Sequence, residues 1–317
     1  MVSENGTDVE LLLFIEGVNA DDSLALCDAT FSRMAPEDLE YFLRGGACPL
    51  TISNATTLDL VRVEASYVRP PMCLRALVRE ELRFGQTQPG VGADYVKVVE
   101  TTFKRFLEAC VLAVGQGPVL IAWRQRLWNS LLRGSWATHV LNAADRDRRV
   151  MNIAKPEELS SIYVRLKMAE ECSAPVRIAA GRLGLAKARE TLDDRLIDAV
   201  IALEALLLSD QKHDRSELSL RAALRAAHWA SDAALGVKPI MAFDIVRAAY
   251  SRRSALVHGG AVSALLIRVG ESTVSLERLV KDTESLVSAM VISALEDLVE
   301  GTSPREWDER LRKSLRQ

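Results

Sequence analysis

The order of apolar and polar positions divides the chain into two halves with different secondary structure. In the first half, four segments have clear periodicity, predicting strands over residues 9–18, 58–68 and 119–123 and a helix over residues 95–114. The helical pattern stops at Gly115-Gln-Gly-Pro118, which is a typical helix end. Residues 1–150 are therefore expected to form a mixed α/β domain.

From residue 154 onward the spacing is helical almost throughout. The predicted helices cover residues 155–171, 175–189, 193–208, 216–230, 239–257 and 272–299, with a short last helix opening at Ser303. The helix over 193–208 is apolar almost all round, which predicts a buried central helix. The expected fold is α+β overall, with an all-α bundle over residues 151–317, and the charged residues 145–149 are the predicted linker.

Composition narrows the class of protein. The chain has 317 residues, of which 49% are apolar and 26% charged, and this length favours two domains. Its net charge of −3 creates no global field for nucleic acid, so any RNA contact needs a local basic patch. The five cysteines lack C-x-x-C spacing, and neither a signal peptide nor a membrane-spanning run is present in the sequence. A cytoplasmic protein without membrane contact is expected.

The segment Tyr250-Ser-Arg-Arg-Ser-Ala-Leu-Val-His-Gly-Gly260 contains the residues best suited to chemistry. Arg253 stays charged and can bind phosphate with two N–H groups, whereas His258 exchanges a proton near neutral pH. On a helix, five positions place the two side chains about 140° apart. They could therefore meet one substrate only if the helix breaks near His258, where the two glycines follow, or if two chains contribute. Alternatively, both residues could simply cap the helix end.

Glu204 lies on an apolar stripe of the predicted central helix and needs a partner there, because a buried carboxylate is costly. Arg225 on the next helix and Arg253 are the candidate partners. Such a pair could fix the register of the bundle, support the site, or do both.

A second candidate segment lies in the first half, where arginines alternate with tryptophans and no acidic residue occurs between Glu108 and Asp145. The residues are Arg124, Arg126 and Arg133 with Trp123, Trp128 and Trp136. Arginine and aromatic faces together suit stacking on unpaired bases. The alternative, which we favour, is a hairpin with core tryptophans and solvated arginines. Because no histidine has ligands at metal spacing and no phosphate-binding loop is present, we expect no metal and no cofactor.

Three blocks of the second half resemble the ApeA-like HEPN domains of bacteria in residues, order and approximate distance. They are Asp193-Asp-Arg-Leu-Ile-Asp-Ala-Val-Ile-Ala-Leu-Glu-Ala-Leu206, Leu220-Arg-Ala-Ala-Leu-Arg-Ala-Ala227 and Tyr250-Ser-Arg-Arg-Ser-Ala-Leu-Val-His-Gly259. The resemblance covers roughly residues 154–299. It implies a helical bundle that dimerises. Many such domains are metal-independent endoribonucleases, and others are interaction or regulatory modules, often in phage defence or toxin–antitoxin systems.

The signature of the active HEPN domains is an arginine, a polar residue and a histidine four to six positions beyond the arginine. Arg253 and His258 match it, and Ser254 stands where asparagine, aspartate or histidine is commoner. The resemblance thus implies a dimeric ribonuclease that binds RNA, with a first half that acts in sensing or in substrate recognition. In it Arg253, His258 and Ser254 are catalytic, Tyr250 and Arg252 position the RNA, and Glu204 and Arg225 support them.

The rival hypothesis is a non-catalytic helical module that binds a regulatory protein partner, a nucleotide or RNA. A metal-dependent nuclease would need an acidic cluster, which the sequence does not contain.

Overall fold

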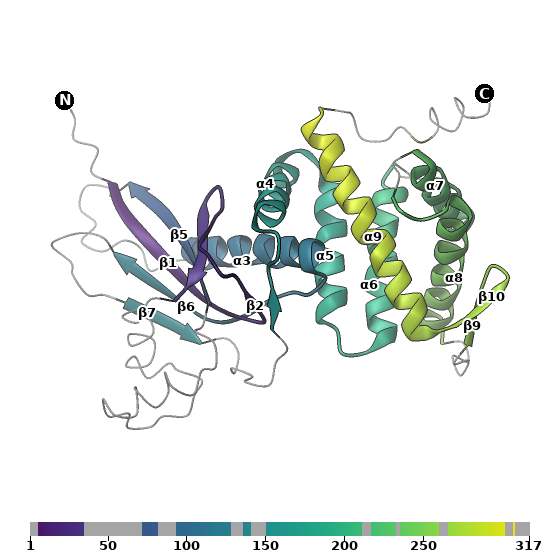
Figure 1. Cartoon of the computed structure of the whole chain (residues 1–317), viewed down its shortest axis with the longest axis horizontal. Coiled ribbons are helices and arrows are strands. Elements are labelled where there is room, and N and C mark those ends of the chain that lie inside the picture. Colours follow the sequence, from purple (N-terminus) through teal and green to yellow (C-terminus); the bar gives the residue numbers. More distant parts are fainter. Residues whose placement is uncertain are drawn as a thin grey trace. The chain divides into compact units, whose positions relative to one another are not determined.

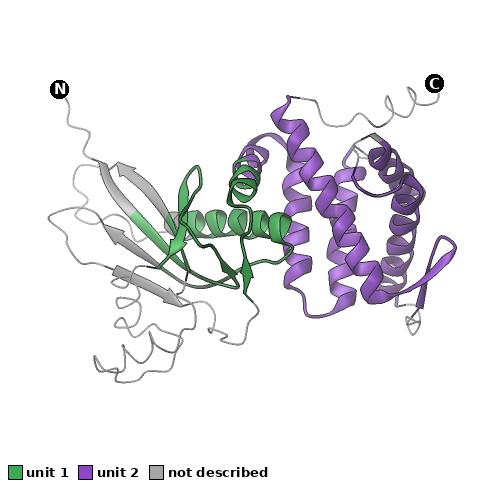
Figure 2. Cartoon of the chain, in the orientation of Figure 1, with its two compact units in different colours: residues 1–164 green, residues 165–317 purple. Residues whose placement is uncertain are grey.

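The computed structural model describes residues 6–34, 72–81, 93–127, 136–140, 150–210, 217–232, 235–259, 266–301 and 307 (Figure 1). The chain divides into two compact units, Met1–Val164 and Arg165–Gln317 (Figure 2). This division falls inside helix α4 (Pro156–Cys172), whereas the sequence predicted a boundary between residues 150 and 151. The predicted linker at residues 145–149 lies outside the described residues. The fold is mixed, with a sheet in the N-terminal part and helices in the C-terminal part, as expected.

Unit 1 is built on an antiparallel sheet in the order β3-β4-β5-β1-β6-β7. The strands are β1 (Gly6–Glu16), β3 (Leu24–Ala25), β4 (Ala29–Arg33), β5 (Met72–Glu81), β6 (Val119–Leu127) and β7 (Trp136–Val140). The apolar run of β1 makes it a central strand, since Leu13 lies opposite both Leu74 of β5 and Trp123 of β6. All three side chains are buried. A separate parallel pair joins β2 (Val18–Asn19) to β8 (Met151–Asn152).

Helix α3 (Ala93–Val114) contacts β1 and β6, and Phe106 on it meets Phe31 of the sheet with ring centroids 4.7 Å apart. The helix ends at Gly115, whose φ of +77° is a left-handed conformation that glycine adopts without strain. The predictions of a strand near residues 9–18, a helix over 95–114 and a strand from 119 are confirmed. The predicted strand over 58–68 lies outside the described residues.

A buried polar cluster in unit 1 joins α3, α4 and the β3–β4 connection. The Arg105 guanidinium donates to the Asp28 carboxylate at 2.7 Å, and the Tyr163 hydroxyl donates to the same carboxylate at 2.7 Å. The Arg105 guanidinium also lies 5.2 Å from the centroid of the Tyr163 ring. Burial, reinforced by Asp28, raises the pKa of Tyr163 above its usual range. Each polar group has a partner, so the cluster holds these elements together.

Unit 2 is a bundle around α6, which contacts α5, α7, α8 and α9. The helices are α5 (Ala174–Ala188), α6 (Leu192–Leu207), α7 (Leu218–Asp232), α8 (Pro239–Val257) and α9 (Leu276–Val299). The apolar residues that predicted a central helix are buried in α6: Leu196, Val200, Leu203, Leu206 and Leu207. The prediction of a buried central helix is therefore confirmed, and α8 has the predicted bounds.

The bundle also contains a hairpin, so the prediction of an all-α second half is wrong in this detail. Strands β9 (Leu266–Val269) and β10 (Ser272–Ser275) pair antiparallel and precede α9. The sequence predicted a helix from residue 272, but the helix begins only at Leu276, because Ser275 caps it by accepting from the Arg278 N–H at 3.2 Å. Residues 303–306 of the predicted last helix lie outside the described residues.

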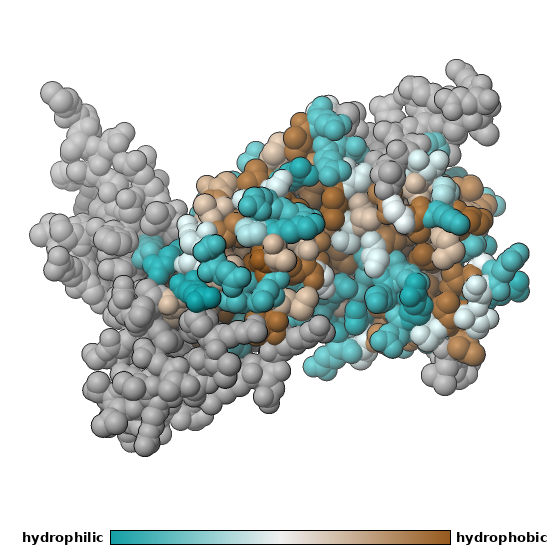
Figure 3. All heavy atoms as spheres, in the orientation of Figure 1, coloured by the Kyte–Doolittle hydropathy of each residue, from teal (hydrophilic) through white to brown (hydrophobic). Residues whose placement is uncertain are grey.

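Exposed apolar side chains are distributed over several helices of unit 2. Large apolar residues with exposed side chains include Ile178 and Leu185 on α5, Leu224 on α7, and Ile240 and Met241 on α8. In the space-filling view, hydrophobic and hydrophilic residues are interspersed over the visible face of this unit (Figure 3). Among the helices that the structure describes, none combines the length and the apolar character that crossing a membrane requires.

Candidate functional site

The end of α8 places the arginine–histidine motif at the surface of unit 2. The helix stops at Val257, and His258 caps it with its backbone N–H bonded to the Ser254 carbonyl at 3.1 Å. Gly259 then adopts a φ of +68°, which turns the chain out of the helix. The helix break predicted after His258 is therefore confirmed.

Arg253 and His258 line one surface pocket, which we call the α8 pocket. Its volume is about 730 Å³ and its described lining consists of Leu218, Ser219, Arg247, Tyr250, Ser251, Arg253, Ser254, Ala255 and His258. The two motif residues line the same pocket although their helical positions differ by about 140°, and the helix ends at Val257, just before His258. A single chain thus brings the predicted catalytic residues Arg253, His258 and Ser254 together.

The chemistry of the α8 pocket suits an anion. Arg247, Arg253 and His258 supply cationic or ionisable groups, and none of the described lining residues is a carboxylate. The remaining polar side chains are three serines and Tyr250, and the serine hydroxyls can donate to phosphate oxygens, whereas the Tyr250 hydroxyl donates to Glu204. Guanidinium groups with hydroxyl donors are a typical arrangement for binding phosphate.

Arg253 has an unused hydrogen-bond donor. Its side chain is half-buried, and its Nε is shielded from solvent without a hydrogen-bond acceptor among the described residues. A buried donor without an acceptor costs about 1–3 kcal/mol, so such groups are rare unless a ligand completes them. The Nε of Arg253 is therefore an unsatisfied donor beside the pocket, and in this conformation a ligand does not reach it because the atom is shielded.

Tyr250 connects the pocket to the central helix. Its buried hydroxyl donates a hydrogen bond of 3.0 Å to Oε1 of Glu204 on α6. Burial raises the pKa of Tyr250 above its usual range, the nearby Glu204 carboxylate raises it further, and Arg253 acts in the opposite direction. Tyr250 therefore remains a neutral phenol. The sequence predicted Arg225 or Arg253 as the partner of Glu204, but the structure shows the Tyr250 hydroxyl in that position.

Arg225 does not support the pocket. It is buried on α7, where its guanidinium binds Asp210 at 2.7 and 2.9 Å and the Leu207 carbonyl at 2.5 Å, and lies 5.6 Å from the centroid of the Trp307 ring. These contacts fix the end of α6 to α7. The predicted role of Arg225 beside Glu204 is therefore corrected to a structural one.

The Arg252 side chain also lies outside the α8 pocket. Its Nη2 lies 3.4 Å from Oδ1 of Asp193 in the first turn of α6, and the residue is not part of the pocket lining. The prediction that Arg252 contacts RNA in this pocket has no support in this geometry. An arginine next to a site residue on a helix faces a different direction, because neighbours differ by about 100°.

His258 is exposed, and its imidazole forms no side-chain hydrogen bond with any residue that the structure describes. Catalytic histidines are usually oriented by a second group that fixes which ring nitrogen carries the proton. In the described residues of one chain, this orienting group is absent from the α8 pocket.

Sequence reasoning missed Arg247 and the first turn of α7. Arg247 lines the pocket and donates from Nη1 to the Ser219 hydroxyl at 3.3 Å. A signal for it was present, because Arg247, Ser251, Ser254 and His258 follow one another at spacings of four, three and four residues, which is one face of a helix. Ser219 could not be found in this way, since it belongs to another helix.

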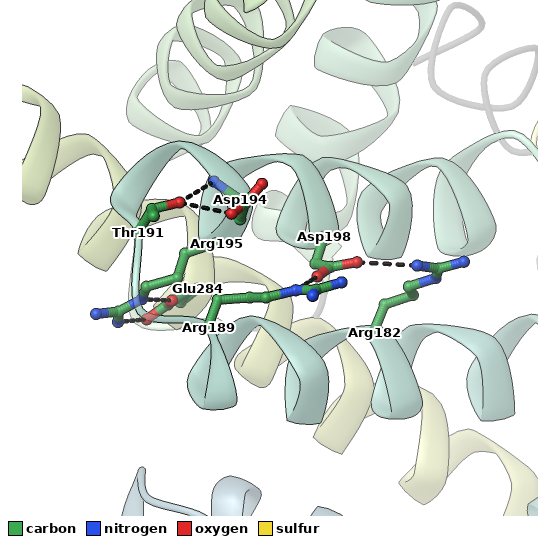
Figure 4. Close-up of polar contacts among 7 residues, drawn as sticks. All are labelled: Arg182, Arg189, Thr191, Asp194, Arg195, Asp198 and Glu284. Carbon is green, nitrogen blue, oxygen red and sulfur yellow. Dashed lines mark hydrogen bonds and ion pairs between the residues drawn. The ribbon is translucent and has the colours of Figure 1, made fainter. Parts of the chain in front are cut away.

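A second charged cluster joins α5, α6 and α9 (Figure 4). Asp198 accepts hydrogen bonds from Arg182 and Arg189, each at 2.9 Å. Glu284 accepts two from Arg195, at 2.9 and 2.8 Å, and one from Lys187 at 2.5 Å. Both carboxylates are buried, so each needs these cations, and the cluster is best explained as a structural connection.

In the arginine- and tryptophan-rich segment of unit 1, the antiparallel pairing and one core tryptophan agree with the favoured hairpin alternative. Strands β6 and β7 pair antiparallel with Arg126 opposite Trp136, and Trp123 is buried. Trp128 and Arg133 lie outside the described residues, and of Arg124, Arg126 and Trp136 only the backbone is described.

Within the described ranges, no three histidine, cysteine, aspartate or glutamate side chains are grouped closely enough to hold a metal ion. Comparison with known proteins finds no family, no curated protein and no solved structure that matches this chain. The similarity to HEPN domains therefore stays a prediction from the three sequence blocks.

Proposed function

We propose that this chain is a metal-independent endoribonuclease of the HEPN type, which cuts RNA by transesterification with the 2′-hydroxyl group. The observation that supports this most directly is the α8 pocket, where Arg253, His258 and Ser254 share one lining. The Arg253 guanidinium adds to it, because its planar set of N–H groups suits the oxygens of a phosphate.

In this reaction a base takes the proton from the 2′-hydroxyl, and the 2′-oxygen attacks the adjacent phosphorus atom. The P–O5′ bond breaks, a 2′,3′-cyclic phosphate forms, and the leaving 5′-oxygen receives a proton. Arg253 binds the phosphate and stabilises the additional charge of the phosphorane. His258 transfers one of the two protons, and Ser254 binds a backbone oxygen, whereas the Tyr250 hydroxyl stays bonded to Glu204.

The second proton-transfer group comes, in this proposal, from a second copy of the chain. The described lining of one pocket contains one histidine, whereas the reaction uses a base and an acid. A homodimer that brings two α8 pockets together would supply both, with each imidazole oriented across the interface. Sedimentation at micromolar concentration tests this directly, and a strict monomer that cleaves RNA would contradict the composite site.

The test of the activity is cleavage of total RNA by the purified chain in the presence of a chelator. We expect fragments that end in a cyclic phosphate, and we expect His258→Ala to lower the rate by at least about 100-fold. His228→Ala is the matched control, because His228 lies on α7 and does not line the pocket. Circular dichroism verifies that both variants fold. Wild-type rates in the His258→Ala protein would overturn the proposal.

Two observations favour the rival function, a non-catalytic module that binds a nucleotide, RNA or a regulatory protein. The His258 imidazole is exposed without an orienting group among the described residues, and Ser254 departs from the usual polar residue of the signature. A binding module would retain RNA without cutting it. In that case Arg253→Ala would weaken binding, and His258→Ala would leave the RNA intact as in the wild type.

A further inference from the structure

The α8 pocket extends beyond the arginine–histidine motif. Arg247 lines it as well and precedes Arg253 by six residues, which corresponds to about 9 Å along the helix axis. The opposite wall at this end is Leu218 and Ser219, the first two residues of α7. The pocket therefore has two cationic positions that are separated along α8.

Arg247 has the properties of a residue that binds a ligand. Its side chain is exposed and makes one hydrogen bond within the described residues, to the Ser219 hydroxyl at 3.3 Å, so most of its five N–H donors have no partner there. Within the described residues it forms no ion pair, although Asp244 lies one helical turn earlier on α8. No carboxylate among the described residues therefore pairs with its charge.

Ser219 contributes to the same position. Its hydroxyl accepts from Arg247 and retains its own proton for a phosphate oxygen. It also lies in the first turn of α7, where backbone N–H groups have no partner within the helix and the helix dipole is positive. Both effects favour an anion beside Arg247.

We propose that Arg247 and Ser219 form a second phosphate subsite, so that the α8 pocket binds two phosphates of one single strand. This inference rests on the proposed function: Arg253 binds the phosphate that is cut, and Arg247 binds a neighbouring phosphate of the same strand. A mononucleotide fills only the first subsite. The ligand class is therefore a polynucleotide strand, which is preferred over a mononucleotide because the two arginine positions are separated along α8.

The probe is a decamer of 2′-O-methyluridine, which lacks the attacking hydroxyl and so reports binding without cleavage. Its affinity is measured by fluorescence anisotropy at several salt concentrations. Each phosphate contact on a single strand contributes about 0.7 to the slope of log affinity against log salt concentration. We expect Arg247→Ala to lower this slope by about 0.7 and to leave competition by uridine 5′-monophosphate unchanged.

Two further variants make the result specific. Arg177→Ala removes an exposed charge from α5, outside the pocket, and should keep the wild-type slope. Arg247→Lys keeps the charge but loses the two-pronged contact, so it should keep the slope and bind less tightly. If Arg247→Ala behaves like Arg177→Ala while Arg253→Ala loses affinity, the second subsite is wrong and the proposed function stands. If Arg253→Ala also binds like the wild type, the proposed function fails as well.

Discussion

Arg253 is held in an environment that prepares it for a ligand. Its neighbour Tyr250 is fixed by the Glu204 carboxylate, and this contact keeps the phenol neutral beside the guanidinium. Glu204 is only half-buried and lies behind the tyrosine, so its charge is not part of the pocket lining. The carboxylate thus acts on the pocket through Tyr250.

Replacing Tyr250 by phenylalanine should reveal this arrangement. The variant removes the only donor that the structure records for Glu204, and a buried or half-buried acceptor without a donor costs about 1–3 kcal/mol. We expect a loss of stability of that size in urea unfolding, together with weaker binding of the 2′-O-methyl decamer. Tyr163→Phe should lose stability but bind the decamer normally. Equal binding by both variants would show that Tyr250 has no role in the pocket.

The residues of the site were predictable to different degrees. Arg253 and His258 were found because their types and spacing are informative by themselves. The partner of Glu204 was not predicted correctly, because the choice among a tyrosine and two arginines depends on how α6, α7 and α8 pack. Arg225 was assigned wrongly for the same reason: Asp210, which binds it, follows the end of α6 in a segment without periodicity.

At the scale of elements, the connection of α5, α6 and α9 depends on two buried carboxylates. Glu284→Gln should destabilise the chain by about 3–5 kcal/mol, because it leaves Lys187 and Arg195 without their counter-charge. The control on the same helix is Asp282→Asn, whose partner Arg278 is 61% exposed and whose ion pair is worth about 0–1 kcal/mol. Denaturant midpoints of both variants measure the difference. Similar losses would mean that burial does not determine the strength of these pairs.

The elements themselves were predicted well where one physical signal dominated. Helix α8 has the predicted bounds, since Pro239 starts it and the glycines end it. Strand β5 was missed because Met, Leu, Ala, Arg and Glu favour helices, and only pairing with β1 and β4 makes the segment a strand. Residues 272–275 were predicted as helix because four residues are too few to show an alternation before the stripe of α9 begins.

At the scale of the whole molecule, each unit contains a buried tyrosine that donates to a carboxylate: Tyr163 in unit 1 and Tyr250 in unit 2. Burial raises the pKa of both phenols above the value of 10.0 that an exposed tyrosine has. Above pH 10 the unfolded chain therefore releases protons that the folded chain retains. The contribution of the two tyrosines to the free energy of unfolding is fully present below that pH. It falls as the pH rises further, by up to about 1.4 kcal/mol per pH unit for each tyrosine.

Urea unfolding at pH 8, 10 and 11 measures this effect. The double variant Tyr163→Phe and Tyr250→Phe should lose less stability between pH 10 and pH 11 than the wild type, although it starts from a lower value. A single variant should lie between the two. If the double variant and the wild type have the same pH dependence, other groups control the alkaline transition.

The turn at Gly259 has a consequence for how the length of this region can vary. One alanine inserted between Ser254 and Val257 would rotate the imidazole by about 100° around the axis and move it by about 1.5 Å, without changing any residue type. The same insertion after Gly259 would leave the distance between guanidinium and imidazole as it is. We therefore expect a change of chain length before this glycine to separate the guanidinium from the imidazole, and a change of length after it to leave the pair in place.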